Sequence, residues 1–441
     1  MGYLATYVVY PFLERYLERD VRSKLRVLRE HFKKPFEERK AYLRRALGRQ
    51  LQVAESCVPY YQQLFKTVRF DLSRVERDLK YLEDLPLLSK EIIMEQGDRM
   101  LNSRLKKEHF VVAKTGGSTG PTMLVYYTKE GADWASAVNQ LVQGWAGRTR
   151  YQKELRLASR FPEEFPLRDR VKEHIKCFAM NRSNVFTHSF DDADLEVVWR
   201  KLRRRKPYLM HGHPSTLYAL ASYLERVRRK ATGVMNVFES TGEVLDQKKR
   251  EKIGQVFGCR CVSRYGNAEF GVTAYETRES NGKLKVVDYV AYPECINSED
   301  GQGGEIVLTG LTNDAMPLIR YRTGDLADLE TRLDGFYYTN IQGRVHDIVR
   351  IGKKTYPTHY IQDLLDRVGG VEEFQVVQRD DGRFLLRIVA SRGADVVSLE
   401  TRIRSWWGDR VIFEFTDLAC LTRFGWQAKF RYLVHTEKDR E

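Results

Sequence analysis

The chain has 441 residues, more than one ordinary core accommodates, so we expect two or three domains. Hydrophobic residues make up 42% and aromatic residues 12%, which excludes a largely disordered chain, and no apolar run is long enough for a transmembrane helix. Lys and Arg outnumber Asp and Glu by 74 to 60, a net charge of +14 that fits solvated helix faces or an anionic partner.

The basic excess peaks in residues 200–208 and 225–230, and solvated helix faces are the favoured interpretation there. A peripheral contact with a membrane surface and an anionic, glycan-linked partner remain alternatives. Neither zinc-finger spacing nor an RNP-type motif accompanies the charge, so we expect no nucleic-acid partner. The six cysteines are scattered without a disulfide pattern, which indicates a cytoplasmic protein. Gly2 lies in a lipidation pattern, but an ordinary N-terminal helix without a signal peptide is favoured.

In chain order, residues 1–100 predict helices rich in Arg, Lys and Glu. A glycine-rich stretch follows and leads into a helix over 129–148, one face of which carries Trp134, Val138, Leu141 and Trp145. Strand and helix patterns alternate from 155 to 265, which is typical of a parallel α/β layer with sites at the strands' carboxyl ends.

Residues 285–340 contain short strands separated by turns and predict a smaller β subdomain. After "IQGRVHD" the pattern changes to a compact α+β unit. We therefore expect an α/β protein with a helical part (1–100), a core (101–343) and a small C-terminal domain (347–441).

Six short motifs follow one another between residues 115 and 431. Glycines and hydroxyls in the first suit phosphate oxygens, although this loop lacks the Gly-Lys-Ser/Thr ending of a Walker loop. The motifs are "TGGSTG" (115–120), "STGE" (240–243), "YGNAEFG" (265–271), "YRTGD" (321–325), "GRVHD" (343–347) and "AKFR" (428–431).

In this order the motifs resemble the signatures of the adenylate-forming enzymes, a superfamily that contains acyl-CoA synthetases. Within it, "VPYYQQLF" (58–65), "LPLLSKEII" (85–93) and "HGHPSTLYALA" (211–221) resemble the phenylacetate–CoA ligase group, and the first and third most resemble its CapK-like capsule-biosynthesis relatives. The resemblance implies a large adenylate-forming domain, with parallel α/β layers and a small β subdomain, and a mobile α+β C-terminal domain that swings on a hinge near 344–347.

The resemblance also implies a two-step reaction with ATP, Mg²⁺ and CoA. A carboxylate attacks the ATP α-phosphate, pyrophosphate leaves, and the acyl group of the acyl-AMP passes to the CoA thiol. Aromatic, fatty and amino acids all remain open as substrates. We expect the acid pocket to be lined by the helix over 130–145, by 210–218, and by residues near 237–243 and 265–272.

The resemblance assigns roles to single residues. Phosphate oxygens would be bound by the loop Thr115, Gly116, Gly117, Ser118, Thr119 and Gly120. Glu269 would coordinate Mg²⁺, Tyr265 and Gly266 would pack against adenine, and Gly242 and Glu243 would line the same pocket. Asp325 would accept the ribose hydroxyls, for which a two-oxygen acceptor is suited.

At the hinge, Arg344 would reach the ribose, and His346 stands where relatives carry Asp or Lys. Lys429 would bridge the α-phosphate and the carboxylate, where negative charge develops in adenylation. The chain departs from the family pattern at Gly116, at Ala268 in place of Thr or Ser, and before Lys429, where Ser-Gly is missing.

Three other hypotheses remain. In the first, the acceptor is an amine or hydroxyl on a capsule or glycan precursor, or AMP itself is transferred. In the second, catalysis has decayed and the fold is a binding module. In the third, His211, His213, Cys259 and Cys261 bind zinc, although ordinary packing is favoured for them.

Overall fold

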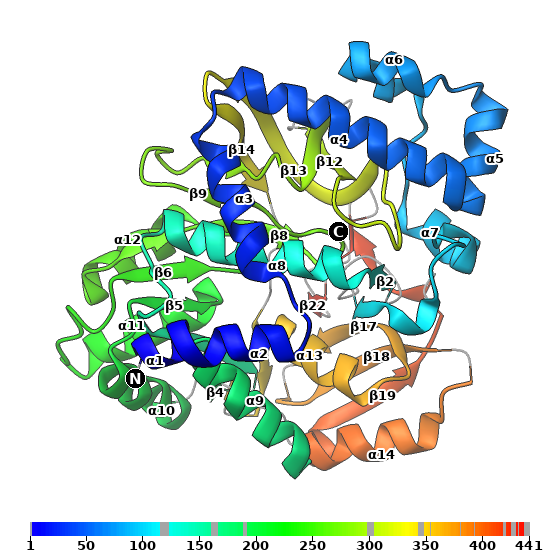
Figure 1. Ribbon diagram of the computed structural model, residues 1–441. Helices are drawn as coiled ribbons and strands as arrows, with labels where there is room; N and C mark the ends of the chain where they lie inside the picture. The colour runs from blue at the N-terminus through cyan, green and yellow to red at the C-terminus, as the bar shows by residue number, and fades with distance from the viewer. Residues whose placement is uncertain are drawn as a thin grey trace. The chain divides into compact units, whose positions relative to one another are not determined.

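In the computed structural model, the chain is an α/β protein, as predicted, with several sheets and helices around them (Figure 1). The structure describes residues 2–114, 123–159, 166–187, 192–297, 304–342, 348–352, 354–379, 381–391, 393–417, 420–424, 429–430 and 432–435. The chain forms two compact units: Met1–Lys114, Leu124–Gln152 and Val262–Arg344 make the first, and Thr115–Met123, Lys153–Cys261 and Val345–Glu441 make the second. The domain limits expected from the sequence stay a prediction.

The N-terminal hundred residues of the first unit are mainly helical, as predicted. Side-chain caps fix several helix starts; Ser89, for example, accepts a hydrogen bond from the Ile92 amide. The elements are α1 (Gly2–Leu4), η1 (Ala5–Val9), α2 (Tyr10–Tyr16), α3 (Val21–Lys33), α4 (Phe36–Cys57), α5 (Pro59–Val68), α6 (Leu72–Arg77), η2 (Leu79–Asp84), α7 (Lys90–Gln96), η3 (Gly97–Met100) and η4 (Lys107–His109).

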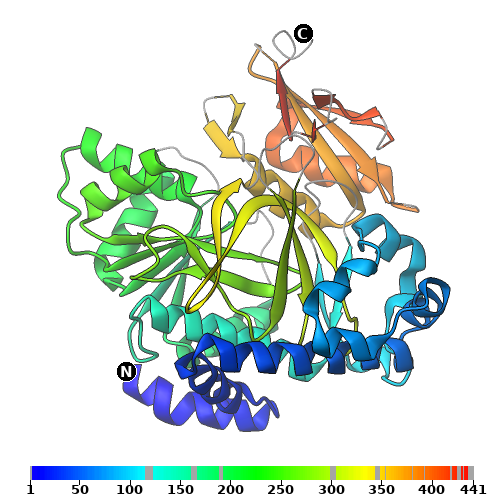
Figure 2. The same cartoon turned by 90° about the horizontal axis from the view of Figure 1, so that it is seen from above.

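A seven-stranded antiparallel sheet forms the centre of the first unit. Its strands are β8 (Arg264–Asn267), β9 (Gly271–Glu276), β10 (Leu284–Val286), β11 (Ala291–Asn297), β12 (Gly304–Gly310), β13 (Tyr321–Arg332) and β14 (Gly335–Gln342), in the order β11-β12-β13-β14-β10-β9-β8. Figure 2 shows its later strands, in yellow, as long twisted ribbons. The helix α4 lies along this sheet, where the Phe36 and Phe336 rings meet edge to face at 5.0 Å. The hairpin of β1 (Val111–Lys114) and β2 (Leu124–Tyr127) and the helix α8 (Lys129–Trp145) complete the unit.

This sheet differs from the expected β subdomain in two respects. It begins at Arg264, about twenty residues before the predicted start, and the stretch 285–293 is divided between β10 and β11. The turn between those strands carries Asp288, which is fully buried and lies 3.1 Å from His31 Nε2. A buried carboxylate requires such a partner, and the alternation of apolar residues does not reveal it.

The second unit contains the predicted parallel α/β layer. Its strands β3 (Glu154–Ser159), β4 (Arg182–Thr187), β5 (Leu209–Gly212), β6 (Val237–Ser240) and β7 (Arg260–Val262) are ordered β4-β3-β5-β6-β7. Strand β3 pairs in parallel with β4 and β5, and β5 pairs in parallel with β6. The helices are α9 (Leu167–Ala179), α10 (Asp192–Arg205), α11 (Pro214–Arg226) and α12 (Gln247–Phe257). Trp199, Leu220 and Phe238 belong to the core between helices and sheet.

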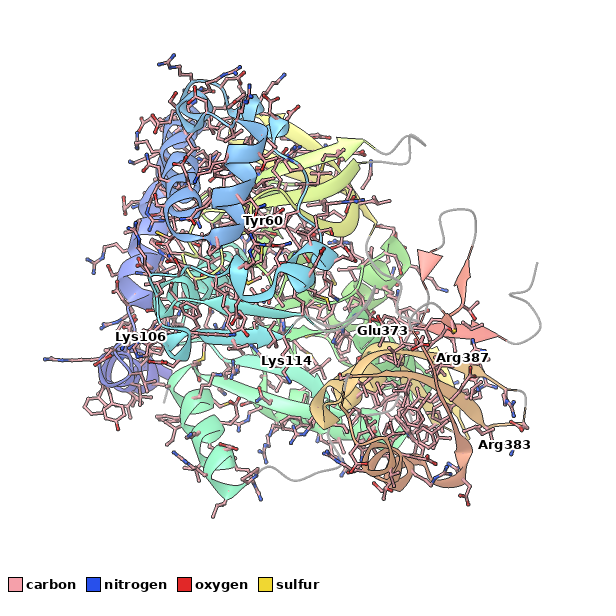
Figure 3. All side chains as sticks on the ribbon, turned by 90° about the vertical axis from the view of Figure 1, so that its right-hand side faces the viewer. Tyr60, Lys106, Lys114, Glu373, Arg383 and Arg387 are labelled. Atoms are coloured by element: carbon pink, nitrogen blue, oxygen red, sulfur yellow. The ribbon has the colours of Figure 1, made fainter. Side chains whose placement is uncertain are left out.

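The C-terminal part of this unit is α+β, as predicted. Its elements are β15 (Ile348–Ile351), β16 (Lys354–Pro357), α13 (Thr358–Val368), β17 (Val371–Gln378), β18 (Phe384–Ala390), α14 (Val396–Trp407), η5 (Gly408–Arg410), β19 (Val411–Phe415), β20 (Arg423–Phe424), β21 (Lys429–Phe430) and β22 (Leu433–His435). One sheet has the order β19-β18-β17-β22. Arg387, labelled in Figure 3, lies on β18 and donates to Glu414 on β19 at 3.1 Å. Among the helices of the described residues, none is both long and apolar enough to cross a membrane.

Candidate active site

The motif "YGNAEFG" forms the hairpin between β8 and β9. Asn267 pairs with Gly271, and the Asn267 side chain accepts a hydrogen bond from the Phe270 amide at 3.0 Å. A Cβ atom added at Gly266 would lie 2.4 Å from the Gly271 carbonyl oxygen, so only glycine fits this close approach of two backbones. The tight hairpin thereby fixes the direction in which Glu269 leaves the sheet.

Tyr265 and Asp325 come from two motifs and meet in the first unit. The Tyr265 hydroxyl donates to Asp325 Oδ2 at 2.9 Å, across 60 positions of the sequence. Burial, and secondarily the negative charge of Asp325, raise the pKa of Tyr265 well above its usual value. The tyrosine therefore keeps its proton and donates a hydrogen bond to the Asp325 side chain.

Glu269 is held by a second tyrosine. The Tyr321 hydroxyl donates to Glu269 Oε1 at 2.8 Å, and Tyr321 is the first residue of the motif that ends in Asp325. Beside it, the Tyr127 hydroxyl donates to the Ala268 carbonyl at 2.5 Å, and burial followed by the charge of Glu269 raises the pKa of Tyr127. Hydrogen bonds from Tyr321 and Tyr127 thus link the hairpin to β13 and β2. The Glu269 carboxylate lies at the edge of a cavity.

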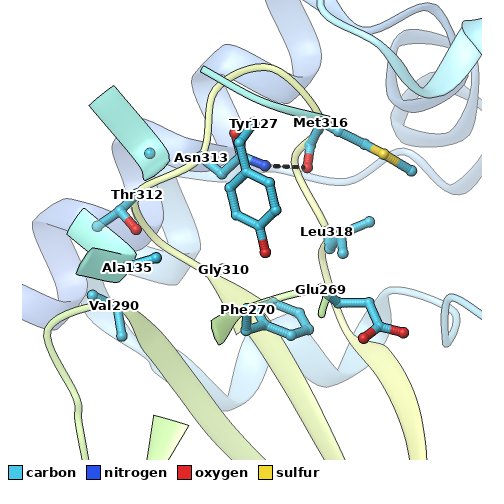
Figure 4. A pocket seen from close by; sticks show the side chains of 11 residues that line it. Tyr127, Ala135, Glu269, Phe270, Val290, Gly310, Thr312, Asn313, Met316 and Leu318 are labelled. Carbon is cyan, nitrogen blue, oxygen red and sulfur yellow. Dashed lines mark hydrogen bonds between the residues drawn. The ribbon is translucent and has the colours of Figure 1, made fainter. Parts of the chain in front are cut away.

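That cavity is the pocket of the first unit shown in Figure 4. It encloses about 390 Å³ of space, including its open mouth. Glu269 and Phe270 form one side, and the α8 residues Gly131 and Ala135 form another. That an acid binds here stays a prediction. The remaining lining residues are Tyr127, Val290, Gly310, Thr312, Asn313, Met316 and Leu318.

The walls of this pocket are anchored by hydrogen bonds. The Asn313 side chain donates to the Tyr126 carbonyl at 2.8 Å and accepts from the Thr128 amide at 3.3 Å, which ties the loop after β12 to β2. The helical face with Val138 and Leu141 is buried, and Trp134 packs on Tyr289 at 4.8 Å, so this face belongs to the core.

In the second unit, the predicted residues Gly242 and Glu243 follow β6, next to the turn between β5 and α11. Glu243 accepts two hydrogen bonds from Ser215, from its amide at 3.0 Å and from its hydroxyl at 2.6 Å. Gly242 has φ +73°, and an added Cβ would lie 2.6 Å from His213 Cε1. The motifs "STGE" and "HGHPS" therefore meet at the carboxyl ends of two parallel strands, as the fold predicts.

The two histidines of the zinc hypothesis, His211 and His213, lie beside carboxylates. His211 Nδ1 lies 2.7 Å from Glu239 Oε1, and His213 Nδ1 lies 3.7 Å from Glu243 Oε1. Within the described part of the chain, no three His, Cys, Asp or Glu residues form a group that could hold a metal ion. None of the six cysteines, all of which lie in the described part of the chain, forms a disulfide.

Several predicted residues lie outside the described residues: Thr115, Gly116, Gly117, Ser118, Thr119, Gly120, Arg344 and His346. Lys429 is described through its backbone alone, in β21, which pairs with β20. Their roles therefore stay predictions.

Sequence reasoning gave no positioning role to four residues that contact the predicted ones: Tyr127, Tyr321, His213 and Ser215. Tyr321 lies in the motif "YRTGD" and Ser215 in "HGHPSTLYALA". Their place in a recognised motif was the signal that could have identified them. Tyr127 carries no such signal, since its bond to Ala268 spans 141 positions.

No protein-family model matches the chain. It is 22% identical over 369 residues to Protein CapK of Staphylococcus aureus, covering 81% of this chain and 80% of CapK. It is 26% identical over 337 residues to the phenylacetate–coenzyme A ligase of Pseudomonas putida, covering 71% of this chain and 73% of that enzyme. The crystal structure of 2-hydroxyisobutyryl-CoA ligase in complex with 2-HIB-AMP and CoA superposes with a TM-score of 0.59 at 20% identity, over 90% of both chains.

The fold is thus that of the adenylate-forming ligases. The chain is thus similar in sequence to CapK and to phenylacetate–coenzyme A ligases and shares its fold with an adenylate-forming ligase, which confirms the resemblance found in the motifs.

Proposed function

We propose that the chain is an ATP-dependent ligase that converts a carboxylic acid to an acyl-AMP and then transfers the acyl group to CoA. The observation that carries this proposal is the paired geometry of two motifs, in which Tyr265 bonds Asp325 and Tyr321 bonds Glu269. Two carboxylates are thereby oriented by buried tyrosines, and one of them, Glu269, borders a pocket, in a chain similar to phenylacetate–coenzyme A ligases.

In the first step, an oxygen of the acid attacks the ATP α-phosphorus and the bond to the β-phosphate breaks, so pyrophosphate leaves. Asp325 would accept the ribose hydroxyls, while Tyr265 and Gly266 would pack against adenine and Gly242 and Glu243 would line its pocket. The backbone amides of 116–120 and the hydroxyls of Thr115, Ser118 and Thr119 would bind the departing phosphates. Lys429 would stabilise the charge that develops between acid and phosphate.

Glu269 fits a Mg²⁺ site of the kind in which one carboxylate joins substrate phosphates and waters. Its Oε1 accepts the Tyr321 hydroxyl at 2.8 Å, and the residue borders the pocket. When bound, the ion would neutralise phosphate charge. Tyr321 would keep the carboxylate in one orientation.

In the second step, the CoA thiolate attacks the acyl carbonyl and AMP leaves. The acid would enter the pocket beside Phe270, whose lining mixes polar and apolar side chains, and its carboxylate would point toward Glu269 and the phosphates. We place the reaction in the cytoplasm, where free thiols stay reduced.

An amine or hydroxyl acceptor, as on a glycan precursor, is a weaker proposal. Its support was the likeness to CapK and the basic segments, in which Arg200 and Arg229 both pair with Glu196 and Arg226 pairs with Asp192. The relatives that are named coenzyme A ligases favour CoA as the acceptor.

The test is pyrophosphate release with ATP and Mg²⁺ across a panel of aromatic, fatty and amino acids, followed by AMP release with and without CoA. We expect acid-dependent pyrophosphate release and CoA-dependent AMP release. Acid-dependent pyrophosphate without any effect of CoA would contradict the thioester step, and release with none of the acids would contradict the ligase proposal.

A further inference from the structure

The helix α9 of the second unit has an inverted polarity. Its side toward β4 is polar: Glu173 accepts hydrogen bonds from Arg182 at 2.9 Å and from Asn184 at 3.1 Å, and the Cys177 thiol also donates to Glu173 at 3.3 Å. The helix is therefore attached to its strand through a carboxylate network. An ordinary surface helix attaches through apolar side chains and turns its polar side outward.

The apolar residues of α9 point to solvent. Leu167, Val171, Ile175 and Phe178 are 74%, 50%, 48% and 42% exposed. Their spacing of four, four and three residues places them in one stripe along the helix. Phe186 is also exposed, and because strand residues alternate it lies on the same face of β4 as Arg182 and Asn184. A stripe of exposed apolar side chains along one helix marks an interaction site.

Basic residues line both flanks of the stripe. At 3.6 residues per turn, Arg168 and Lys172 fall on one flank and Arg170 and His174 on the other, and all four are exposed. The acidic residues of α9 lie away from the stripe: Glu173 bonds β4, and Asp169 falls on the opposite side of the helix. The surface thus combines an apolar centre with cationic edges, which complements an apolar layer beneath anionic head groups.

We propose that α9 binds an anionic phospholipid surface, with its apolar stripe at the boundary between head groups and acyl chains and its bases on the phosphates. A second copy of the chain is a poorer occupant, because a twofold contact through this stripe would bring its basic flanks together. The N-terminal helical residues also expose aromatic side chains, namely Tyr3, Tyr7, Phe12 and Tyr16. Arg15 is the one exposed base among residues 2–16, so this segment lacks the basic flanks that α9 has.

The experiment is co-sedimentation of the full chain with vesicles of phosphatidylcholine alone and of phosphatidylcholine with phosphatidylglycerol. We expect binding to the anionic vesicles that weakens as salt rises. At about 1 kcal/mol per base near such a surface, R168Q/K172Q should weaken binding by about 30-fold. V171S/I175S should abolish it, and V197S, on the exposed face of α10, should bind as the unchanged chain does.

Equal binding to both kinds of vesicle, no binding to either, or unchanged binding by V171S/I175S would each overturn the proposal. So would light scattering that detects a dimer which V171S/I175S dissociates, in the absence of vesicle binding. All the substituted side chains are exposed, and circular dichroism melting should confirm that each variant folds. Vesicle binding is measured without ATP, acid or CoA, so its result is independent of the ligase proposal.

Discussion

The hydroxyl of Tyr321 is the residue-scale feature on which the proposed metal site depends most. It lies 2.8 Å from Glu269 Oε1, and the tyrosine is buried. Tyr321→Phe removes this bond and keeps the buried ring. A hydrogen bond to a charged group contributes about 1.5–3 kcal/mol, so we expect pyrophosphate release to fall roughly 10- to 100-fold and the Mg²⁺ concentration for half-maximal rate to rise.

The matched control for this substitution is Tyr338→Phe. Tyr338 is equally buried in the same sheet, but its hydroxyl has no hydrogen-bond partner among the described residues. Removing that hydroxyl should leave the Mg²⁺ dependence unchanged. A Mg²⁺ titration of Tyr321→Phe that overlays the titration of Tyr338→Phe would show that Tyr321 does not position Glu269.

At this scale, the sequence identified the residue types of the candidate site but not their partners. Glu269 and Asp325 stood out because their motifs contain glycine and tyrosine in a recognisable order. The bonds to Tyr321 and Tyr265 span 52 and 60 positions, and a single sequence carries no signal for such long-range pairs.

At the scale of elements, the hairpin between β8 and β9 depends on Gly266. An added methyl group would lie 2.4 Å from the Gly271 oxygen and 2.9 Å from Val272 Cα, and neither backbone atom can move without shifting a strand. We expect Gly266→Ala to lower the free energy of unfolding by about 1–3 kcal/mol, as overpacking does. Urea unfolding followed by tryptophan fluorescence measures this change.

Gly144→Ala is the opposite case and serves as control. Gly144 lies in α8, and an added Cβ would meet nothing within 4 Å. Alanine there should stabilise the helix by up to about 1 kcal/mol. Equal stability of the two variants would mean that the hairpin backbones are not in close contact.

The elements themselves were predictable where their pattern is local. The helix α13 and the strands around it follow from apolar periodicity and turn residues, because each is stabilised by its own burial pattern. The start of the seven-stranded sheet was not predictable. Strands β7 and β8 are adjacent in the chain but belong to different sheets, and nothing in "CRCVSRYG" marks the change.

At the scale of the whole molecule, the proposed reaction requires Lys429, whose sequence position is 160 residues beyond Glu269 and in the other unit. In the proposed mechanism the positive charge of Lys429 stabilises the negative charge that develops at the α-phosphate. This negative charge develops in the first step alone. Lys429→Ala should therefore lower acid-dependent pyrophosphate release by about 100- to 1,000-fold, the usual effect of losing one such group. Binding of ATP, measured by calorimetry, should persist.

The second step provides the internal control for this variant. In thioester formation the acyl-AMP is already present, and AMP is the leaving group. No negative charge therefore develops between the acid and a triphosphate. With a synthetic acyl-AMP and CoA, Lys429→Ala should form thioester within about threefold of the unchanged rate, because a factor of that size is well below one charge-assisted bond. A loss of both steps together would indicate that Lys429 stabilises the C-terminal part of the chain. Unchanged pyrophosphate release would remove it from the mechanism, and only a selective loss of adenylation supports the role that the sequence predicts.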